Sequence, residues 1–377
     1  MKVAGIIAEY NPFHNGHAFL AKRAREEGAT HVIAVMSGNF VQRGEPAIFE
    51  QSVRIKAALQ NGIDLVLQLP AVYAVSSAQS FAQAGVEILD AFGCVDWLVF
   101  GSECGDILKI QEVCQNLNSD KIKIFLEQEL KKGLMFASAR ENALRNISPE
   151  CADIIKSPNN ILGVEYVAAL ERCGSKIMPM TFKRVGIGHD SPFVCNNFAS
   201  ASLIRKMMSE GGHWEQLVPE NTVEIYRNAE IADRKRIENA VLYRMRTADR
   251  SSLANTPDIS EGIENRILSA SEKATSIEEL YALAKTKRYS HARIRRIITN
   301  YFIGITKDDL KIQVPYIRVM GLNSRGAELL REEKNARIPV ITKAADLACL
   351  NEEANRIFAI ECRSSDIFSL CKPFTKA

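Results

Sequence analysis

The sequence lacks the features that mark several large classes of protein. It contains no run of 18 or more apolar residues, so no segment is expected to cross a membrane. The apolar run Val3–Ala8 ends at Glu9 and is too brief for the apolar region of a secretory signal peptide. Internal repeats and low-complexity tracts are also absent. These absences predict a globular protein located in the cytoplasm.

Cysteine pairs of the CxxC type are missing as well. The nine cysteines are odd in number, and none is followed by another three positions later. Such usage is typical of reduced thiols in a cytosolic protein. It argues against a structural zinc site.

The net charge of the chain is also small. The 48 Lys and Arg residues exceed the 45 Asp and Glu residues by only three, so any basic site must be local. The length of 377 residues leaves room for two or three compact units. A hydrophobic content of 46% allows a full core without cross-links.

The first 210 residues alternate between short apolar runs and amphipathic stretches, as repeated βα units do. The expected strands are Val3–Ala8, His31–Met36, Ile63–Leu69, Val95–Gly101 and Lys176–Lys183. The expected helices are Ala18–Glu27, Gln51–Asn61 and Gln79–Phe92. Near-continuous apolar strands suit a parallel sheet covered on both faces. The prediction is a doubly wound, Rossmann-like α/β domain over residues 1–215.

The pattern changes at about residue 215. Helical stretches dense in Arg and Lys run over residues 221–250 and 261–305. Two short strand patterns, at 315–322 and 337–342, flank a helical one and indicate a small appended α/β element. Residues 216–377 are therefore predicted to form a second, mainly helical region.

In doubly wound sheets the ligand lies beyond the carboxyl ends of the strands. The loop after the first strand contains His14-Asn15-Gly16-His17. Two histidines three apart at a helix start face the same side, and their N–H groups, with the helix terminus, can bind phosphate. Gly16 would let the backbone approach a nucleotide closely. The motif indicates a phosphate site; a polar loop or a metal pair are the alternatives on spacing alone.

A second candidate phosphate site is the segment SASLIR, residues 200–205. It combines the hydroxyls of Ser200 and Ser202 at a helix start with the guanidinium of Arg205 one turn later, which suits a pyrophosphate group. Plain helix capping by either serine is the alternative. The two motifs together are much less expected by chance than either alone.

These motifs carry a family resemblance. HNGH in this position resembles the HxGH motif of the nucleotidyltransferase superfamily, whose members adenylate substrates by attack on the α-phosphate of ATP, and SASLIR resembles its second signature. Longer motifs narrow the resemblance to the tRNA(Met) cytidine acetate ligase family. They are IIAEYNPFHNGH (6–17), MSGNFVQRGEPA (36–47), FGSE (100–103), SPNNILG (157–163), KR (183–184) and YSHARIRR (289–296).

The resemblance implies a two-step reaction. Acetate attacks the α-phosphate of ATP to give acetyl-adenylate and pyrophosphate, and the exocyclic amine of the wobble cytidine of elongator tRNA(Met) then takes the acetyl group to give N4-acetylcytidine. ATP and Mg²⁺ are the implied cofactors, and acetate and elongator tRNA(Met) are the implied partners. The oligomeric state is left open. Such chemistry needs positioning, neutralisation of phosphate charge and exclusion of water.

The resemblance and the residue chemistry together assign roles. His14 and His17 would be catalytic by stabilising phosphate charge; Lys22 would assist as a point charge, with a solvated helix face as its alternative. No protein ligand for a metal is expected, because Mg²⁺ would bind through the ATP phosphates. The implied ATP site comprises Ile7, Ala8, Glu9, Tyr10, Asn11, Pro12, Phe13, His14, Asn15, Gly16, His17, Gly101, Asn159, Asn160, Arg184, Ser200, Ser202 and Arg205.

Some residues of this set also have a purely structural interpretation. Gly101 would let adenosine lie against the backbone. Asn159 or Asn160 would contact ATP, or else cap a helix, and Arg184 would bind ATP or be a surface charge. The wall near acetate is expected from Ser37, Gly38, Asn39 and Phe40. The polar loop over residues 42–46 is long enough to be a lid or a substrate contact.

A basic stretch lies between residues 285 and 296, where six Lys and Arg residues and one His occur without an acid. A solvated helix face is the plain interpretation. Phosphate backbones favour such patches, so tRNA binding is the better one. The residues are Lys285, Lys287, Arg288, His291, Arg293, Arg295 and Arg296.

Two other functions stay open at this point. An adenylyltransferase or a pantothenate-synthetase-like ligase acting on a small metabolite would use the same phosphate motifs but leaves the basic stretch unexplained. A non-catalytic RNA-binding protein with a vestigial nucleotide fold is the other, and the intact histidine pair argues against it.

Overall fold

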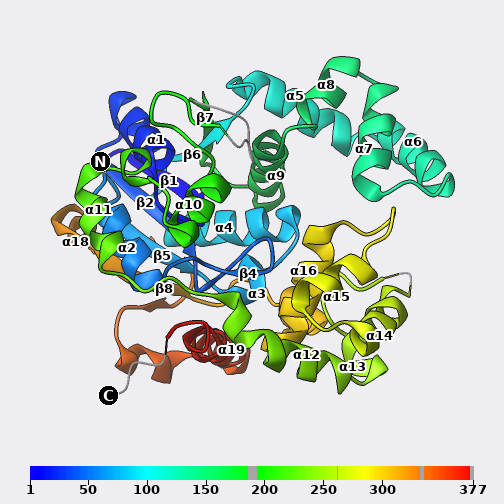
Figure 1. The fold of residues 1–377 in the computed structure, drawn as a ribbon. Coiled ribbons are helices and arrows are strands. Elements are labelled where there is room, and N and C mark those ends of the chain that lie inside the picture. Colours follow the sequence, from blue (N-terminus) through cyan, green and yellow to red (C-terminus); the bar gives the residue numbers. More distant parts are fainter. Residues whose placement is uncertain (186–192, 261, 332–334, 374–377) are drawn as a thin grey trace.

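The centre of the computed structural model, which describes residues 1–185, 193–260, 262–331 and 335–373, is a seven-stranded sheet (Figure 1). The strand order is β7-β6-β1-β2-β5-β8-β9. The parallel strands are β1 (Val3–Ala8), β2 (His31–Ser37), β5 (Leu65–Leu69), β6 (Trp97–Ser102) and β7 (Met178–Lys183). They match the strands predicted from the apolar runs, with ends shifted by at most two residues.

Helices cover both faces of the sheet, as expected for a doubly wound domain. On one face α4 (Ala78–Phe92) and α9 (Pro158–Cys173) contribute to the core around Leu67 and Leu98. On the other face α1 (Asn15–Glu26) and α2 (Gln51–Leu59) pack against alternate residues of the same strands. The fold class predicted from the sequence is thus confirmed.

The remaining elements fall into three groups along the chain. After β2 come the short strands β3 (Phe40–Val41) and β4 (Glu45–Pro46) and the short helix α3 (Ala71–Ala74). Between β6 and α9 lie α5 (Ile107–Asn118), α6 (Asp120–Lys131), α7 (Phe136–Arg145) and α8 (Pro149–Ile154). After β7 follow α10 (Ala201–Glu210), α11 (Glu220–Arg227), α12 (Glu238–Arg246), α13 (Arg250–Ala254), α14 (Ile263–Lys273), α15 (Ile277–Ala284), α16 (His291–Ile303) and α17 (Lys307–Lys311).

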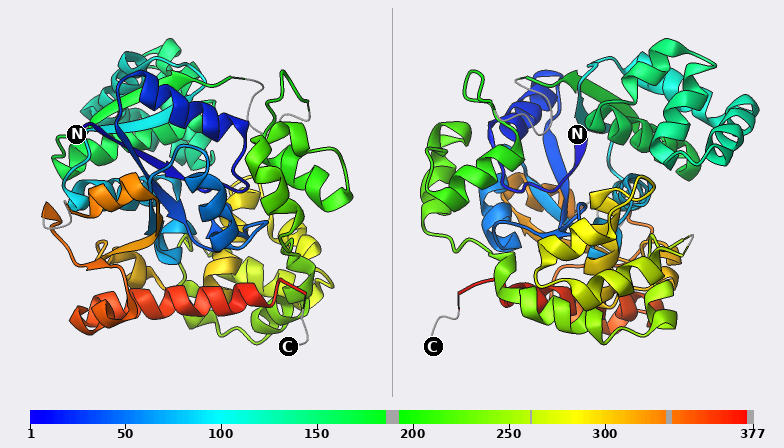
Figure 2. Two further views of the ribbon diagram at one scale, coloured as in Figure 1. Left: turned by 90° about the vertical axis from the view of Figure 1, so that its left-hand side faces the viewer. Right: turned by 45° about the vertical axis from the view of Figure 1, so that its right-hand side comes forward.

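Helices α12–α16 form a separate hydrophobic core, built mainly from residues 237–301. The last part of the chain returns to the sheet. Residues from Ile303 to Phe368 contribute to the same core as the central strands, and α19 (Glu352–Ser369) lies against α3 and α16 (Figure 2).

The expected appended α/β element is instead the edge of the main sheet. Strand β8 (Ile317–Leu322) pairs antiparallel with β5, and β9 (Val340–Ile341) pairs parallel with β8, on either side of α18 (Ser324–Leu330). A boundary at residue 215 therefore does not separate two cores, because residues beyond 303 complete the first one.

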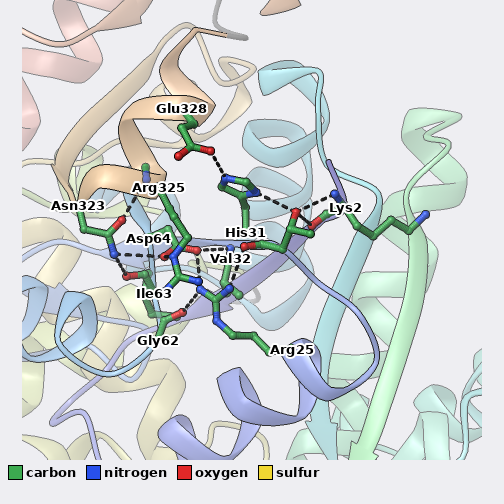
Figure 3. A network of polar contacts seen from close by, with 12 residues as sticks. Lys2, Arg25, His31, Val32, Gly62, Ile63, Asp64, Asn323, Arg325 and Glu328 are labelled. Atoms are coloured by element: carbon green, nitrogen blue, oxygen red, sulfur yellow. Dashed lines mark hydrogen bonds and ion pairs between the residues drawn. The ribbon is translucent and has the colours of Figure 1, made fainter.

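Asp64 joins this edge to the rest of the sheet (Figure 3). Its carboxylate is fully buried. Its Oδ2 accepts from the backbone N–H of Val32 at 2.8 Å and from Nη2 of Arg25 at 2.6 Å, and its Oδ1 accepts from Nδ2 of Asn323 at 3.1 Å. Asn323 also caps α18. One carboxylate thus holds α1, β2 and α18 together, and these contacts fix where β8 docks.

The state of the cysteines and the composition of the helices bear on two of the predictions. All nine cysteines are free in the structure. Within the described ranges, none of the helices combines the length and the apolar composition that crossing a bilayer requires.

Candidate active site

The loop after β1 enters α1 through His14, which caps the helix. Nδ1 of His14 accepts the backbone N–H of Gly16 at 3.0 Å, and Nδ1 of His17 accepts the backbone N–H of His14 at 3.2 Å. The two rings stack with their centroids 3.8 Å apart. A neutral imidazole that accepts at Nδ1 carries its proton on Nε2. The local backbone therefore fixes both histidines as Nε2–H donors.

Burial keeps both imidazoles neutral. It lowers the pKa of His14 to about 3, with the charges of Arg184 and Arg205 contributing. Burial, followed by the neighbouring His14 and Arg184, lowers the pKa of His17 well below its usual value of 6.5. At neutral pH the pair thus offers hydrogen bonds without charge, and the two arginines supply the positive charge that phosphates require.

These pKa directions predict a loss of stability in mild acid. Below pH 6.5 the unfolded chain protonates these imidazoles while the folded protein does not, so the unfolded state binds more protons. The unfolding free energy should be at its full value above about pH 7 and fall from pH 6.5 downward, by up to about 1.4 kcal/mol per pH unit for each histidine. Denaturant titrations at pH 7.5, 6.5 and 5.5 measure it.

The variant His14→Gln isolates the contribution of one imidazole, since every other titrating group is unchanged. Its unfolding free energy should depend less steeply on pH below 6.5 than that of the unchanged protein. Equal slopes in the two proteins would contradict the lowered pKa.

One cavity lies at the carboxyl ends of β1 and β6, bordered by the starts of α1, α9 and α10. Most of the predicted ATP residues line it. They are Ile7, Ala8, Glu9, Tyr10, Asn11, His14, His17, Gly101, Asn159, Arg184, Ser202 and Arg205. An adjoining recess is lined by Gly16 and shares both histidines, Gly101 and Arg184. The structure therefore brings the two phosphate motifs together from positions almost 190 residues apart.

Four further predicted ATP residues belong to the loops around the cavity, and three of them form hydrogen bonds there. The carbonyl of Phe13 accepts from the Tyr226 hydroxyl at 3.0 Å. Nδ2 of Asn15 donates at 2.9 Å to the carbonyl of Asn197, before α10, and at 2.9 Å to that of Gln216, before α11. Pro12 follows a cis peptide bond, and Ser200 caps α10 by accepting the N–H of Leu203 at 3.2 Å.

Asn159 and Asn160 differ in whether they border the cavity. Oδ1 of Asn160 accepts the backbone N–H groups of Glu103 at 2.9 Å and Cys104 at 3.1 Å, so this buried side chain holds the loop after β6. Asn159 borders the cavity, and its Nδ2 donates to Glu103 at 2.6 Å. Of the pair, Asn159 is therefore the one placed to contact a ligand.

At Gly101 the backbone forms part of the cavity wall. A Cβ atom there would lie 3.2 Å from Cγ of Arg184, so a side chain would push that arginine aside. This tight fit is compatible with a flat group lying against the backbone.

The four residues predicted to form the wall near acetate do not line the cavity. Ser37, Gly38, Asn39 and Phe40 are buried, and the cavity-lining residues of the described chain include none of them. The reason is Arg54, which is fully buried and donates from Nη1 to the Ser37 carbonyl at 3.1 Å and from Nη2 to the Gly38 carbonyl. These bonds hold the segment in the core, and four of the next residues line the cavity: Val41, Gln42, Arg43 and Glu45.

Lys22 is also displaced from the cavity. Its side chain is 75% exposed on α1, and Nζ lies 3.7 Å from a carboxylate oxygen of Glu26. Among the described residues that line the cavity, Lys22 does not occur. This position corresponds to the solvated helix face that was the alternative interpretation.

The hairpin formed by β3 and β4, residues 40–46, connects the cavity to α16. Gln42, Arg43 and Glu45 line the cavity. On the outer side, the Gly44 carbonyl accepts from Oγ1 of Thr299 at 2.8 Å. Gly44 has φ +74°, and a Cβ there would lie 2.6 Å from the backbone of Arg295, so no larger residue fits.

The basic stretch divides into two sets. Arg293, Arg295 and Arg296 are half-buried, and each binds another part of the chain. Arg293 donates to the carbonyl of Asp258 at 3.0 Å, Arg296 contacts the Asp258 carboxylate at 2.6 Å, and Arg295 contacts Glu45 at 2.7 Å. The exposed members are Lys285, Lys287, Arg288 and His291.

Part of the cavity wall was not predicted. Phe81 on α4 and Leu162 and Tyr166 on α9 supply an apolar side. Their helical spacing is that of ordinary core positions, so periodicity does not distinguish them. Arg43 and Glu45 lie in the loop expected to be a lid or substrate contact, and only the pairing of β3 with β4 turns them inward.

A parallel sheet with a histidine pair at the first helix start and a Ser–Arg helix start facing it defines a nucleotidyltransferase. A model of the HIGH Nucleotidyl Transferase family matches residues 1–377. A "tRNA(Met) cytidine acetate ligase" of Clostridium kluyveri is 38% identical over 98% of this chain and 95% of the relative. A second, of a Thermoanaerobacter species, is 42% identical over 92% and 89%. The chain therefore belongs to the tRNA(Met) cytidine acetate ligase family, which confirms the resemblance.

Solved structures agree with this assignment. The apo crystal structure of Thermotoga maritima TmcAL superposes with a TM-score of 0.93 at 32% identity, over 99% of this chain and 95% of that one. A second crystal structure of that protein, bound with alpha-thio ATP, gives a TM-score of 0.92 with the same coverage and identity.

Proposed function

We propose that the protein is an ATP-dependent ligase that joins acetate to the exocyclic amine of the wobble cytidine of elongator tRNA(Met), by way of acetyl-adenylate, to give N4-acetylcytidine. The observation that carries the proposal is the pair of neutral Nε2–H donors of His14 and His17, placed in one cavity with Ser202 and Arg205. This arrangement fits a triphosphate.

In the first step, we place adenosine against Gly101 and the phosphates against the histidine pair, Arg184 and Arg205. A carboxylate oxygen of acetate forms a bond to the α-phosphorus while the bond to pyrophosphate breaks. The Nε2–H donors and the arginines stabilise the charge that develops on the phosphate oxygens. The apolar side around Tyr166 limits the access of water to the mixed anhydride.

Mg²⁺ belongs to this proposal as a partner of the phosphates. Among the described residues, no three His, Cys, Asp or Glu side chains are grouped so as to hold a metal ion. The ion would therefore be held by ATP and water, and it would neutralise phosphate charge. The protein residues nearest to such a complex would be Arg184 and Arg205.

We propose that the tRNA backbone is bound by the exposed residues Lys285, Lys287, Arg288 and His291. The half-buried arginines of α16 would hold the segment that carries these residues against the rest of the chain. Residues 216–303 would then carry the RNA and residues 1–215 the ATP. A cytoplasmic location remains a prediction that follows from a tRNA substrate.

The proposal is tested by incubating the protein with ATP, Mg²⁺, labelled acetate and total tRNA, then digesting the RNA. Labelled N4-acetylcytidine is the expected product. Acetyl-coenzyme A without ATP should give none, since the cavity presents phosphate-binding groups for a triphosphate. Acetate-dependent pyrophosphate exchange without label in RNA would favour a ligase for a small metabolite instead.

We expect the triple variant K285A/K287A/R288A to bind tRNA more weakly and with a flatter dependence on salt. Each lost phosphate contact should reduce the slope of log K against log[salt] by about one. Acetyl-adenylate synthesis should survive, because none of the three residues borders the cavity. Filter binding over a salt series, beside pyrophosphate exchange, measures both effects.

The matched control removes three exposed lysines from other elements, Lys56, Lys176 and Lys206. It changes the net charge equally and should leave the salt slope nearly unchanged. An equal loss of affinity in both triple variants would show that net charge, rather than this segment, governs tRNA binding.

A further inference from the structure

Two carboxylates, Glu9 and Glu45, line the cavity that we assign to ATP. An anion gains nothing from a carboxylate nearby, because like charges repel strongly where water is scarce. Their presence indicates a second ligand that donates hydrogen bonds. The exocyclic amine of cytosine is such a donor, and carboxylates are its usual acceptors in proteins.

Glu45 already has partners. Its Oε1 lies 2.7 Å from Nη1 of Arg295 and 3.2 Å from Nη1 of Arg234. Both guanidinium groups thus bind the same carboxylate oxygen. Glu45 therefore links the hairpin to Arg234 and to α16, and its Oε1 is already occupied.

Glu9 differs from Glu45 in its partners. It directly follows β1, and Nη1 of Arg54 binds its backbone carbonyl at 2.6 Å. Its Oε1 accepts the backbone N–H of Gln42 at 2.9 Å. Its Oε2 has no hydrogen-bond partner in the part of the chain that the structure describes. The carboxylate is thus fixed at one oxygen and leaves the other for a ligand.

Burial and the surrounding charges have opposite effects on the proton affinity of Glu9. Burial raises the pKa of Glu9, and it outweighs the Gln42 N–H and the charges of Arg205, Arg43 and Arg54, which lower it. A carboxylate with a raised pKa accepts a proton near neutral pH more readily than an ordinary one. Tyr166 on α9 faces Glu9, and burial raises the pKa of its phenol, so it stays protonated.

The other titratable groups of the cavity are not available as acceptors. Nδ1 of His14 and of His17 each accept a backbone N–H, and their Nε2 atoms carry the protons. Burial raises the pKa of Tyr10, which therefore remains neutral. Arg43, Arg184 and Arg205 are cations. Among the described lining residues, elimination leaves Glu9.

On the basis of the proposed ligase function, we propose that Glu9 is the proton acceptor for the amine of cytidine in the transfer step. The amine nitrogen forms a bond to the acetyl carbonyl carbon, and the bond from that carbon to the phosphate oxygen of AMP breaks. AMP leaves with the bonding electrons as a phosphate anion. One amine proton passes to Oε2 of Glu9 and then to water. Acetyl-adenylate formation transfers no such proton.

The variant Glu9→Gln tests the assignment. It retains an oxygen for the Gln42 N–H but cannot accept a proton. We expect acetate-dependent pyrophosphate exchange to fall far less than transfer, because adenylation removes no proton from an amine. Single-turnover transfer from the isolated acetyl-adenylate complex to tRNA should fall by about 10²-fold, the usual contribution of a general base. The transfer rate of the unchanged protein should rise with pH through the ionisation of Glu9, and that rise should vanish in the variant.

Two further variants make the result specific. Glu9→Asp keeps the carboxylate and should restore part of the transfer rate with its pH dependence. Glu45→Gln should retain the pH dependence of transfer, because the assignment gives Glu45 no proton. Thermal unfolding of each variant shows whether it is folded.

Three outcomes would overturn the assignment. Equal loss of exchange and transfer in Glu9→Gln would place Glu9 in ATP binding, and unchanged transfer would show that another group takes the proton. If the unchanged protein supports neither exchange nor transfer, the ligase function itself fails and the assignment falls with it. The first two outcomes require an active unchanged protein, so the failures are distinguishable.

Discussion

Replacing His14 or His17 with Ala should lower the rate of acetate-dependent pyrophosphate exchange by about 10²–10³-fold, which is the usual cost of losing one oriented donor to transition-state charge. Each ring presents an Nε2–H group, because the backbone occupies each Nδ1. The pair lies in a cavity whose lining includes Arg43, Arg184 and Arg205. Loss of one donor therefore affects the transition state more than the ground state.

His14 also caps α1, so an alanine there removes a structural bond as well, at a cost of about 1 kcal/mol. The variant His14→Asn separates the two effects, since asparagine is a good helix cap but lacks a group in the place of Nε2. It should fold with near-normal stability and still lose exchange. His213→Ala, an exposed histidine outside the cavity, is the matched control. Normal exchange in His14→Asn or in His17→Ala would refute the assigned role.

Substituting Met for Arg54 should lower the unfolding free energy by about 3–5 kcal/mol, as removal of one member of a buried polar network does. Arg54 is fully buried, and its pKa, lowered to about 10 by burial, leaves it charged at neutral pH. Its guanidinium donates to the carbonyls of Phe49, Glu9, Ser37 and Gly38. The methionine fills similar space but leaves these buried carbonyls without a donor.

Urea titrations of Arg54→Met and of the unchanged protein measure this loss. Arg23→Ala serves as the control, because Arg23 forms exposed ion pairs with Glu26 and Glu27 that contribute little. The control should change the unfolding free energy by less than about 1 kcal/mol. A similarly small effect at Arg54 would mean that water replaces the guanidinium at the four carbonyls.

The sequence alone predicts the parts of this molecule that depend on local patterns. The parallel strands follow from apolar runs, and the HNGH loop follows from its place between the first strand and the first helix. Those features need only neighbours along the chain. The family resemblance then names the remaining ATP residues, and the structure brings most of them to one cavity.

Features set by distant partners could not be predicted in this way. Strand β8 belongs to the sheet because Asp64 binds Asn323, about 260 residues later. Ser37–Phe40 lie inside the core because Arg54 binds the carbonyls of Ser37 and Gly38. Half of the basic stretch is engaged within the protein because Asp258 and Glu45 are folded against α16. No spacing or periodicity in the sequence indicates that these residues pair.

The position of β8 also has a consequence for synthesis on the ribosome. All the predicted ATP residues precede residue 206, yet the strand that covers the edge of β5 and the helices that complete its core come from the last quarter of the chain. Until those residues emerge, β5 presents unpaired backbone groups, and Asp64 lacks Asn323. The nascent chain therefore exposes an edge that is prone to pair with other chains while most of the protein is made. Binding of ATP by stalled nascent chains should begin only after β8 and α18 have left the exit tunnel.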